Sequence, residues 1–130
     1  MTPRERYEAV LSGRRPDLVP RIPILMQFAA EYIGSNYGEF AADHRVLVEA
    51  NLRCAEDFGL DQVSTISDPY RETSGFGAEI RYHRDGVPEC VRPPFADLSP
   101  GDPFTTRIAV PDPLTATRMR DRVEAVRLFR

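Results

Sequence analysis

The sequence predicts an α/β fold with a parallel sheet, and two features of its first half support this. Two short segments, Ile22–Met26 and Asp61–Ile66, are apolar or rich in β-branched residues, as in strands buried on both faces. A long amphipathic helix separates them, with Asp43 as its N-cap and Gly59 just after its end. Strand, helix and strand in this order form the unit of a parallel sheet. We expect a single domain over residues 1–130.

A short helix should precede the first strand. Thr2 is placed as an N-cap, Pro3 occupies the first helical position, and Glu5 completes a capping box. Gly13 provides a left-handed stop for this helix.

The second half of the chain predicts a β-hairpin inserted into this pattern. Polar and apolar side chains alternate over Ala78–His83, Asp85-Gly86 is a strong turn pair, and Glu89–Arg92 returns. Residues 93–113 are rich in proline and predict an irregular connection. A last helix should begin near Thr117. Its inward face is expected to consist of three residues, Met119, Val123 and Val126.

Composition restricts the class of protein. The net charge is −3, and the basic residues are all arginine, which does not suggest a nucleic-acid partner. The start of the chain lacks the apolar region of a signal peptide, and no apolar stretch could span a membrane, so we expect a cytoplasmic protein. The arginines near the end are expected to form a solvated helix face in preference to a phosphate site: Arg118, Arg120, Arg122, Arg127 and Arg130.

The cysteines and histidines do not have the spacing of a metal site. Cys54 and Cys90 lie far apart and are expected to be buried free thiols. His44 and His83 have no ligand at a suitable spacing, so we expect surface or capping roles. The loops after the two strands also lack the glycines that phosphate-binding βαβ proteins use.

The succession of motifs resembles the uroporphyrinogen decarboxylase superfamily, which includes decarboxylases and corrinoid-dependent methyltransferases. The resemblance covers essentially the whole chain, in the order that the family shows. Its motifs are Met1-Thr-Pro-Arg-Glu-Arg6, Gly13-Arg-Arg-Pro-Asp-Leu-Val-Pro20, Phe58-Gly-Leu-Asp61, Ser67-Asp68, Phe76-Gly-Ala-Glu79, Asp85-Gly-Val-Pro88 and Val110-Pro-Asp-Pro113.

This resemblance implies the N-terminal portion of a (β/α)8 TIM-type barrel with a β-hairpin insertion. Such barrels typically need about 250 residues, so 130 residues would leave the barrel incomplete. An open sheet has an unpaired edge, which favours pairing with another chain. The chain would then be a piece of a longer protein, a homo-oligomer, or a free-standing variant.

The resemblance also implies a site at the carboxyl ends of the strands. Asp68 follows the second strand, and in the decarboxylases an aspartate in the Ser-Asp motif binds pyrrole N–H groups. We expect Asp68 to be catalytic and substrate-binding, with Gln27 and Tyr70 as substrate-binding residues that line the same opening of the barrel. Asp68 lies directly before Pro69, so it is also suited to cap a new helical turn.

One stretch departs from the decarboxylases. Where they carry an arginine-rich motif after the first strand, this chain has Gln27-Phe-Ala-Ala-Glu31-Tyr32. A glutamate repels a polycarboxylate substrate, so the resemblance favours the methyltransferase branch. That branch uses zinc to activate a thiol and takes its His and Cys ligands from later in the chain.

We therefore expect no cofactor or metal to be bound by this segment alone, with corrinoid and zinc possible only in a complete protein, and no activity from the isolated chain. A small molecule or a corrinoid would be the substrate. The alternative is a non-catalytic remnant, or a module that associates through its open sheet edge.

Overall fold

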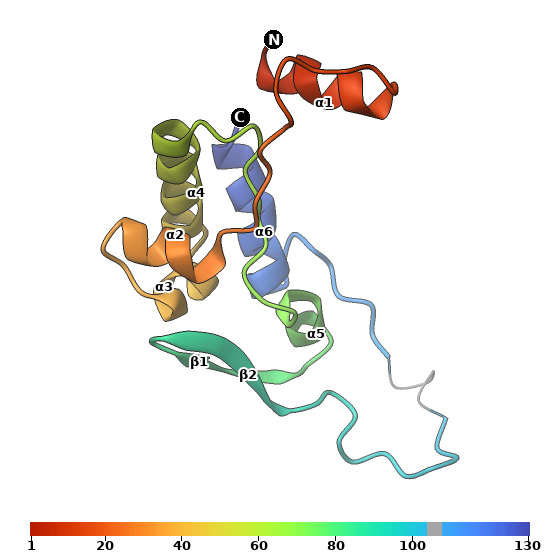
Figure 1. The fold of residues 1–130 in the computed structure, drawn as a ribbon. Helices are drawn as coiled ribbons and strands as arrows, with labels where there is room; N and C mark the ends of the chain where they lie inside the picture. Colours follow the sequence, from red (N-terminus) through yellow and green to blue (C-terminus); the bar gives the residue numbers. More distant parts are fainter. Residues whose placement is uncertain (104–107) are drawn as a thin grey trace.

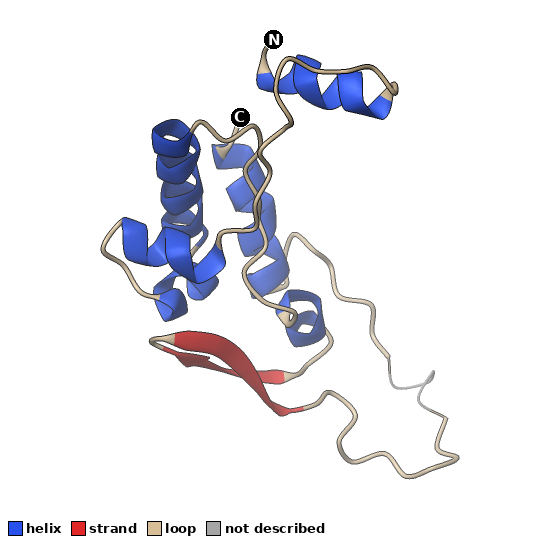
Figure 2. Cartoon of the chain, viewed as in Figure 1, coloured by secondary structure: helices blue, strands red, loops and turns tan. Residues whose placement is uncertain are grey.

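A computed structural model of the chain describes residues 1–103 and 108–130. It combines helices with one two-stranded antiparallel sheet (Figures 1 and 2). In chain order the elements are α1 (Pro3–Leu11), α2 (Met26–Tyr32), α3 (Tyr37–Ala42), α4 (His44–Phe58), α5 (Arg71–Gly75), β1 (Glu79–His83), β2 (Gly86–Arg92) and α6 (Thr117–Leu128).

The predicted ends of two helices are confirmed. The Thr2 hydroxyl accepts the Glu5 N–H at the start of α1, and the Glu5 carboxylate accepts the Thr2 N–H in return. At the start of α4 the Asp43 carboxylate accepts the Arg45 N–H at 2.8 Å. Gly59 ends α4 with φ 59°, a left-handed conformation that glycine adopts at little cost.

The prediction that Ile22–Met26 and Asp61–Ile66 are strands is wrong. Residues 21–25 and 62–68 form neither helix nor paired strand, and Met26 already begins α2. The two segments run side by side (Figure 1), and the Asp61 N–H donates to the Arg21 carbonyl at 2.8 Å. A buried parallel strand needs a bonded neighbour on each side. Among the described residues these segments have no further neighbour of that kind, and Ile24 is 62% exposed.

The hydrophobic core lies instead among helices. It joins α2, α3 and α4 to α6, and its fully buried members are Ala29, Ala30, Phe40, Leu47, Ala50 and Cys54. The sequence did not predict α2 or α3. Asn36 caps α3 by accepting the Glu39 N–H at 3.0 Å.

The hairpin is confirmed, with β1 and β2 antiparallel and Gly86 opposite His83. It packs against α3 (Figure 2). There the Gly38 N–H donates to the Arg84 carbonyl at 2.9 Å. A Cβ on Gly38 would lie 2.5 Å from the His83 carbonyl oxygen. The close approach of α3 and the hairpin therefore requires glycine here.

The start of α6 at Thr117 is confirmed, and its predicted inward face is confirmed only in part, because Met119 and Val123 are half-buried. The buried residues of α6 are Arg118 and Ala125, while Val126 is 46% exposed. The expectation that Arg118 lies on a solvated face is wrong for the same reason. No helix in the described parts of the chain is long and apolar enough to cross a membrane.

Candidate functional site

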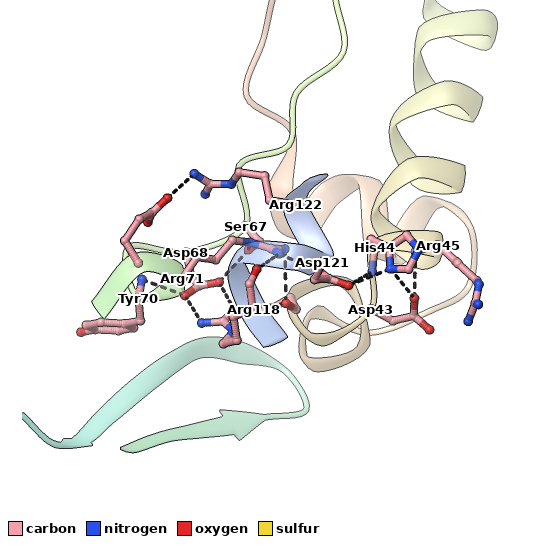
Figure 3. Close-up of polar contacts among 12 residues, drawn as sticks. Asp43, His44, Arg45, Ser67, Asp68, Tyr70, Arg71, Arg118, Asp121 and Arg122 are labelled. Atoms are coloured by element: carbon pink, nitrogen blue, oxygen red, sulfur yellow. Dashed lines mark hydrogen bonds and ion pairs between the residues drawn. The ribbon is translucent and has the colours of Figure 1, made fainter. Parts of the chain in front are cut away.

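Asp68 lies where the second extended segment reaches α5, and its carboxylate is fully engaged. Arg118 donates to both oxygens, Nη1 to Oδ1 at 2.9 Å and Nη2 to Oδ2 at 2.7 Å (Figure 3). The Ser67 hydroxyl donates to Oδ2 at 2.6 Å, and the Tyr70 N–H donates to Oδ1 at 2.9 Å. The Tyr70 bond closes a turn, so Asp68 supports the start of α5, although α5 begins at Arg71.

The surroundings keep the Asp68 carboxylate ionised. Burial by itself would raise its pKa, but the hydrogen bonds from Arg118, Ser67 and the Tyr70 backbone outweigh burial and hold the pKa below its usual value. A buried carboxylate in this state accepts hydrogen bonds and does not donate them.

Arg118 connects three elements to the carboxylate. From α6 its Nη2 also donates to the Ala41 carbonyl in α3 at 3.2 Å. Its guanidinium lies 5.0 Å from the centre of the Tyr82 ring in β1. Helix α6, helix α3 and the hairpin are therefore joined at the Asp68 carboxylate.

A second buried arginine extends the network. Arg71 is 1% exposed, and its Nε donates to the Ser67 hydroxyl at 2.9 Å. Its Nη1 contacts Asp121 Oδ2 at 2.6 Å, and Asp121 Oδ1 lies 2.7 Å from His44 Nδ1 (Figure 3). Two buried arginines are thus each matched by an aspartate, as buried ions require.

One group of side chains has the composition of a cation site. Asp43, His44 and Asp121 each place a ligand atom within 4.8 Å of the others. Both Asp121 oxygens and one Asp43 oxygen are already in use: Asp121 Oδ1 accepts the His44 N–H at 3.0 Å, Asp43 Oδ1 accepts the Arg45 N–H, and Arg71 is paired with Asp121 Oδ2. The arrangement joins α4 to α6 through the hydrogen bonds of His44 to Asp121. His44 is thus half-buried and paired, whereas His83 lies exposed beside Glu89.

Asp68, Gln27 and Tyr70 were expected to line one site at the carboxyl ends of the strands, but the structure places them differently. Tyr70 meets Asp68 through its backbone, and its ring points away from the arginines (Figure 3). Gln27 is exposed on α2, where its amide donates to the Glu31 carboxylate at 2.8 Å. The structure therefore places Tyr70 next to Asp68, whereas Gln27 is hydrogen-bonded to Glu31.

A polar cavity of about 710 Å³ opens beside the network. Its lining includes Arg118, His44, Asp121 and Tyr82. Arg118 therefore contributes to the lining of this cavity and also pairs with the Asp68 carboxylate.

The sequence did not predict the roles of Arg71, Arg118 and Asp121. Arg118, Asp121 and Ala125 have i, i+3, i+7 spacing, which places them on one face of a helix. That spacing was the available signal, but an arginine is rarely fully buried unless it is paired, and its partner lies 50 residues away.

The comparison with known proteins identifies one family. The family model described as uroporphyrinogen decarboxylase (URO-D) matches residues 2–130. Neither a curated protein nor a solved structure matches the chain. The helices and the two-stranded sheet are consistent with an incomplete barrel. The chain belongs to the uroporphyrinogen decarboxylase family, whose fold is a TIM barrel.

Proposed function

We propose that this chain supplies the first part of a URO-D-family enzyme that transfers a methyl group from a corrinoid to a thiol, and not of a true tetrapyrrole decarboxylase. The isolated chain is expected to be inactive, because a barrel builds its site from the ends of many strands. When bound, the methyl-corrinoid supplies the methyl group.

The observation that carries this proposal is the pair formed by Gln27 and Glu31. The two side chains lie one helical turn apart on α2, exposed, and bonded to each other at 2.8 Å. They occupy the stretch where the decarboxylases that the sequence resembles carry arginines. An amide and a carboxylate supply no positive charge for a polycarboxylate, so a porphyrinogen with acidic side chains is disfavoured.

In this proposal Asp68 accepts N–H groups of the bound molecule. Its lone pairs are now occupied by Arg118, Ser67 and the Tyr70 backbone. A ligand N–H must therefore displace one of these donors, because the Arg118 guanidinium has no acceptor to offer it.

The described residues do not fit a zinc centre. Their one cluster of three candidate ligands, around His44 and Asp121, already uses both Asp121 oxygens and one Asp43 oxygen for N–H groups and Arg71. Burial raises the pKa of the Cys54 thiol, which disfavours the thiolate that zinc binds. No step of the reaction is assigned to zinc in this chain.

Titration of the purified chain with methylcobalamin and with uroporphyrin tests the proposal. We expect binding of methylcobalamin that Asp68→Ala weakens, and no saturable binding of uroporphyrin. Uroporphyrin binding without corrinoid binding would favour a decarboxylase. If neither molecule binds either form, the enzyme proposal is wrong for this chain.

A second candidate is the non-catalytic module that associates through unpaired segments. Apolar side chains of both extended segments are exposed, with Ile22 at 49%, Ile24 at 62% and Ile66 at 43%. They line part of one small cavity between the segments. Sedimentation across concentrations tests this candidate. A dimer that Ile24→Asp dissociates supports it, and a monomer at all concentrations argues against it.

A further inference from the structure

Helix α6 presents a second face, away from Asp68, that lines a half-open groove of about 470 Å³. Its apolar lining consists of Pro113, Met119, Val123 and Val126. Its charged lining consists of Glu72, Arg122, Arg127 and Arg130. An apolar surface with a few charged groups at its margin is typical of small-molecule sites, and this volume lies within their usual range.

Arg122 is incompletely paired. Its Nη1 donates to Glu72 at 2.6 Å, but its Nε is buried and has no hydrogen-bond partner in the described part of the chain. A buried donor without an acceptor is destabilising. The Nε atom itself has no exposed surface, so a ligand carboxylate would meet the rest of the Arg122 guanidinium, on a side chain that is 33% exposed.

The charges of the groove determine the sign of its ligand. Three arginines and one glutamate line it, and Glu72 is already bonded to Arg122. Arg127 is partly balanced by Glu124 at 2.6 Å. The excess of guanidinium groups disfavours a cation, and the apolar floor gives a bare inorganic anion little contact.

We propose that this groove binds an amphiphilic monocarboxylate, a molecule with an apolar body and one carboxylate. The apolar body lies on Met119, Val123 and Val126, and the carboxylate is held at Arg122. Arginine suits this role because its fork of N–H groups matches a carboxylate. The site is distinct from Asp68 and does not depend on the proposed methyl transfer.

Decanoate and its uncharged analogue decanamide test the proposal by NMR titration of the whole chain. Decanoate should shift the methyl signals of Met119, Val123 and Val126, and decanamide should bind at least about tenfold more weakly, as the loss of a charged hydrogen bond implies. Arg122→Gln should weaken the binding of decanoate by a similar factor. Glu72→Gln should strengthen the binding of decanoate, because the carboxylate that competes for Arg122 is removed.

Arg120→Gln is the matched control. Arg120 lies on the same helix and carries the same charge, but it lines the polar cavity beside Arg118 and not this groove. This variant should leave decanoate binding unchanged. Equal binding of decanamide, equal losses in Arg120→Gln and Arg122→Gln, or shifts confined to Ile22 and Ile24 would overturn the proposal. So would a dimer whose interface protects the groove, since a second copy would then be its occupant.

Discussion

The Asp68 carboxylate and the Arg118 guanidinium form a two-point ion pair between residues 50 positions apart, at 2.9 and 2.7 Å. The Asp68 side chain is fully buried, and that of Arg118 is 9% exposed. This pair holds α6 against the turn that carries Asp68, so the helix and the site depend on each other.

Replacing Arg118 should destabilise the fold strongly. Arg118→Met leaves the buried Asp68 carboxylate without its cation, and we expect a loss of about 3–5 kcal/mol in the free energy of unfolding. Urea denaturation measures it. The double variant Asp68→Asn, Arg118→Met removes both charges and should lose less than the sum of the two single variants. Additive losses would contradict the coupling.

Acid should remove the stability that Asp68 contributes. Its pKa is lowered in the folded chain, so the contribution is complete above the ordinary value of 3.8 and is lost as the pH falls through the folded value. The unfolding free energy of the native chain should therefore fall more steeply below about pH 4 than that of Asp68→Asn. Parallel curves for the two proteins would show that Asp68 does not titrate with a lowered pKa.

The two cysteines should differ in reactivity. Cys54 is fully buried in the core and burial raises its pKa, whereas Cys90 is only half-buried in β2. With a thiol reagent under native conditions, Cys90 should react first and Cys54 only on unfolding. Mass spectrometry of Cys90→Ser isolates the Cys54 signal. Rapid labelling of Cys54 in that variant would argue against its burial.

Gly38→Ala should loosen the hairpin from α3. The new Cβ would lie 2.5 Å from the His83 carbonyl oxygen, so the backbone must move and the bond from Gly38 to Arg84 should break. We expect the free energy of unfolding to fall by about 1–3 kcal/mol and amide hydrogen exchange in β1 and β2 to become faster. Gly86→Ala is the control, because its nearest neighbour would lie 3.8 Å away. Equal exchange in both variants would contradict the contact.

Local signals in the sequence predicted the parts of the fold that local physics determines. The capping box at Thr2 and the N-cap at Asp43 act within a few residues, and both are confirmed. The turn predicted at Asp85-Gly86 lies one residue earlier, at Arg84-Asp85, with Gly86 already in β2 opposite His83. The extended segments failed as strands because pairing depends on distant neighbours. The short capped helix α3 gives no long periodic pattern to detect.

The sequence pointed to only part of the candidate site, because the rest depends on residues that lie far apart in the chain. Asp68 follows from its position in the Ser-Asp motif, but its partner Arg118 lies on a helix whose apolar residues predicted a different buried face. Burial of an arginine depends on a carboxylate that only the tertiary structure supplies. The pairing of Gln27 with Glu31 follows directly from their i, i+4 spacing.

The most direct test of the account is the affinity for uroporphyrin of the variant Gln27→Arg, Glu31→Arg compared with the native chain. If the absence of positive charge on α2 is what disfavours a polycarboxylate, the variant should bind uroporphyrin at least about tenfold more tightly, a gain typical of charged hydrogen bonds. Tight binding by the native chain, or no gain in the variant, would contradict the proposal of methyl transfer.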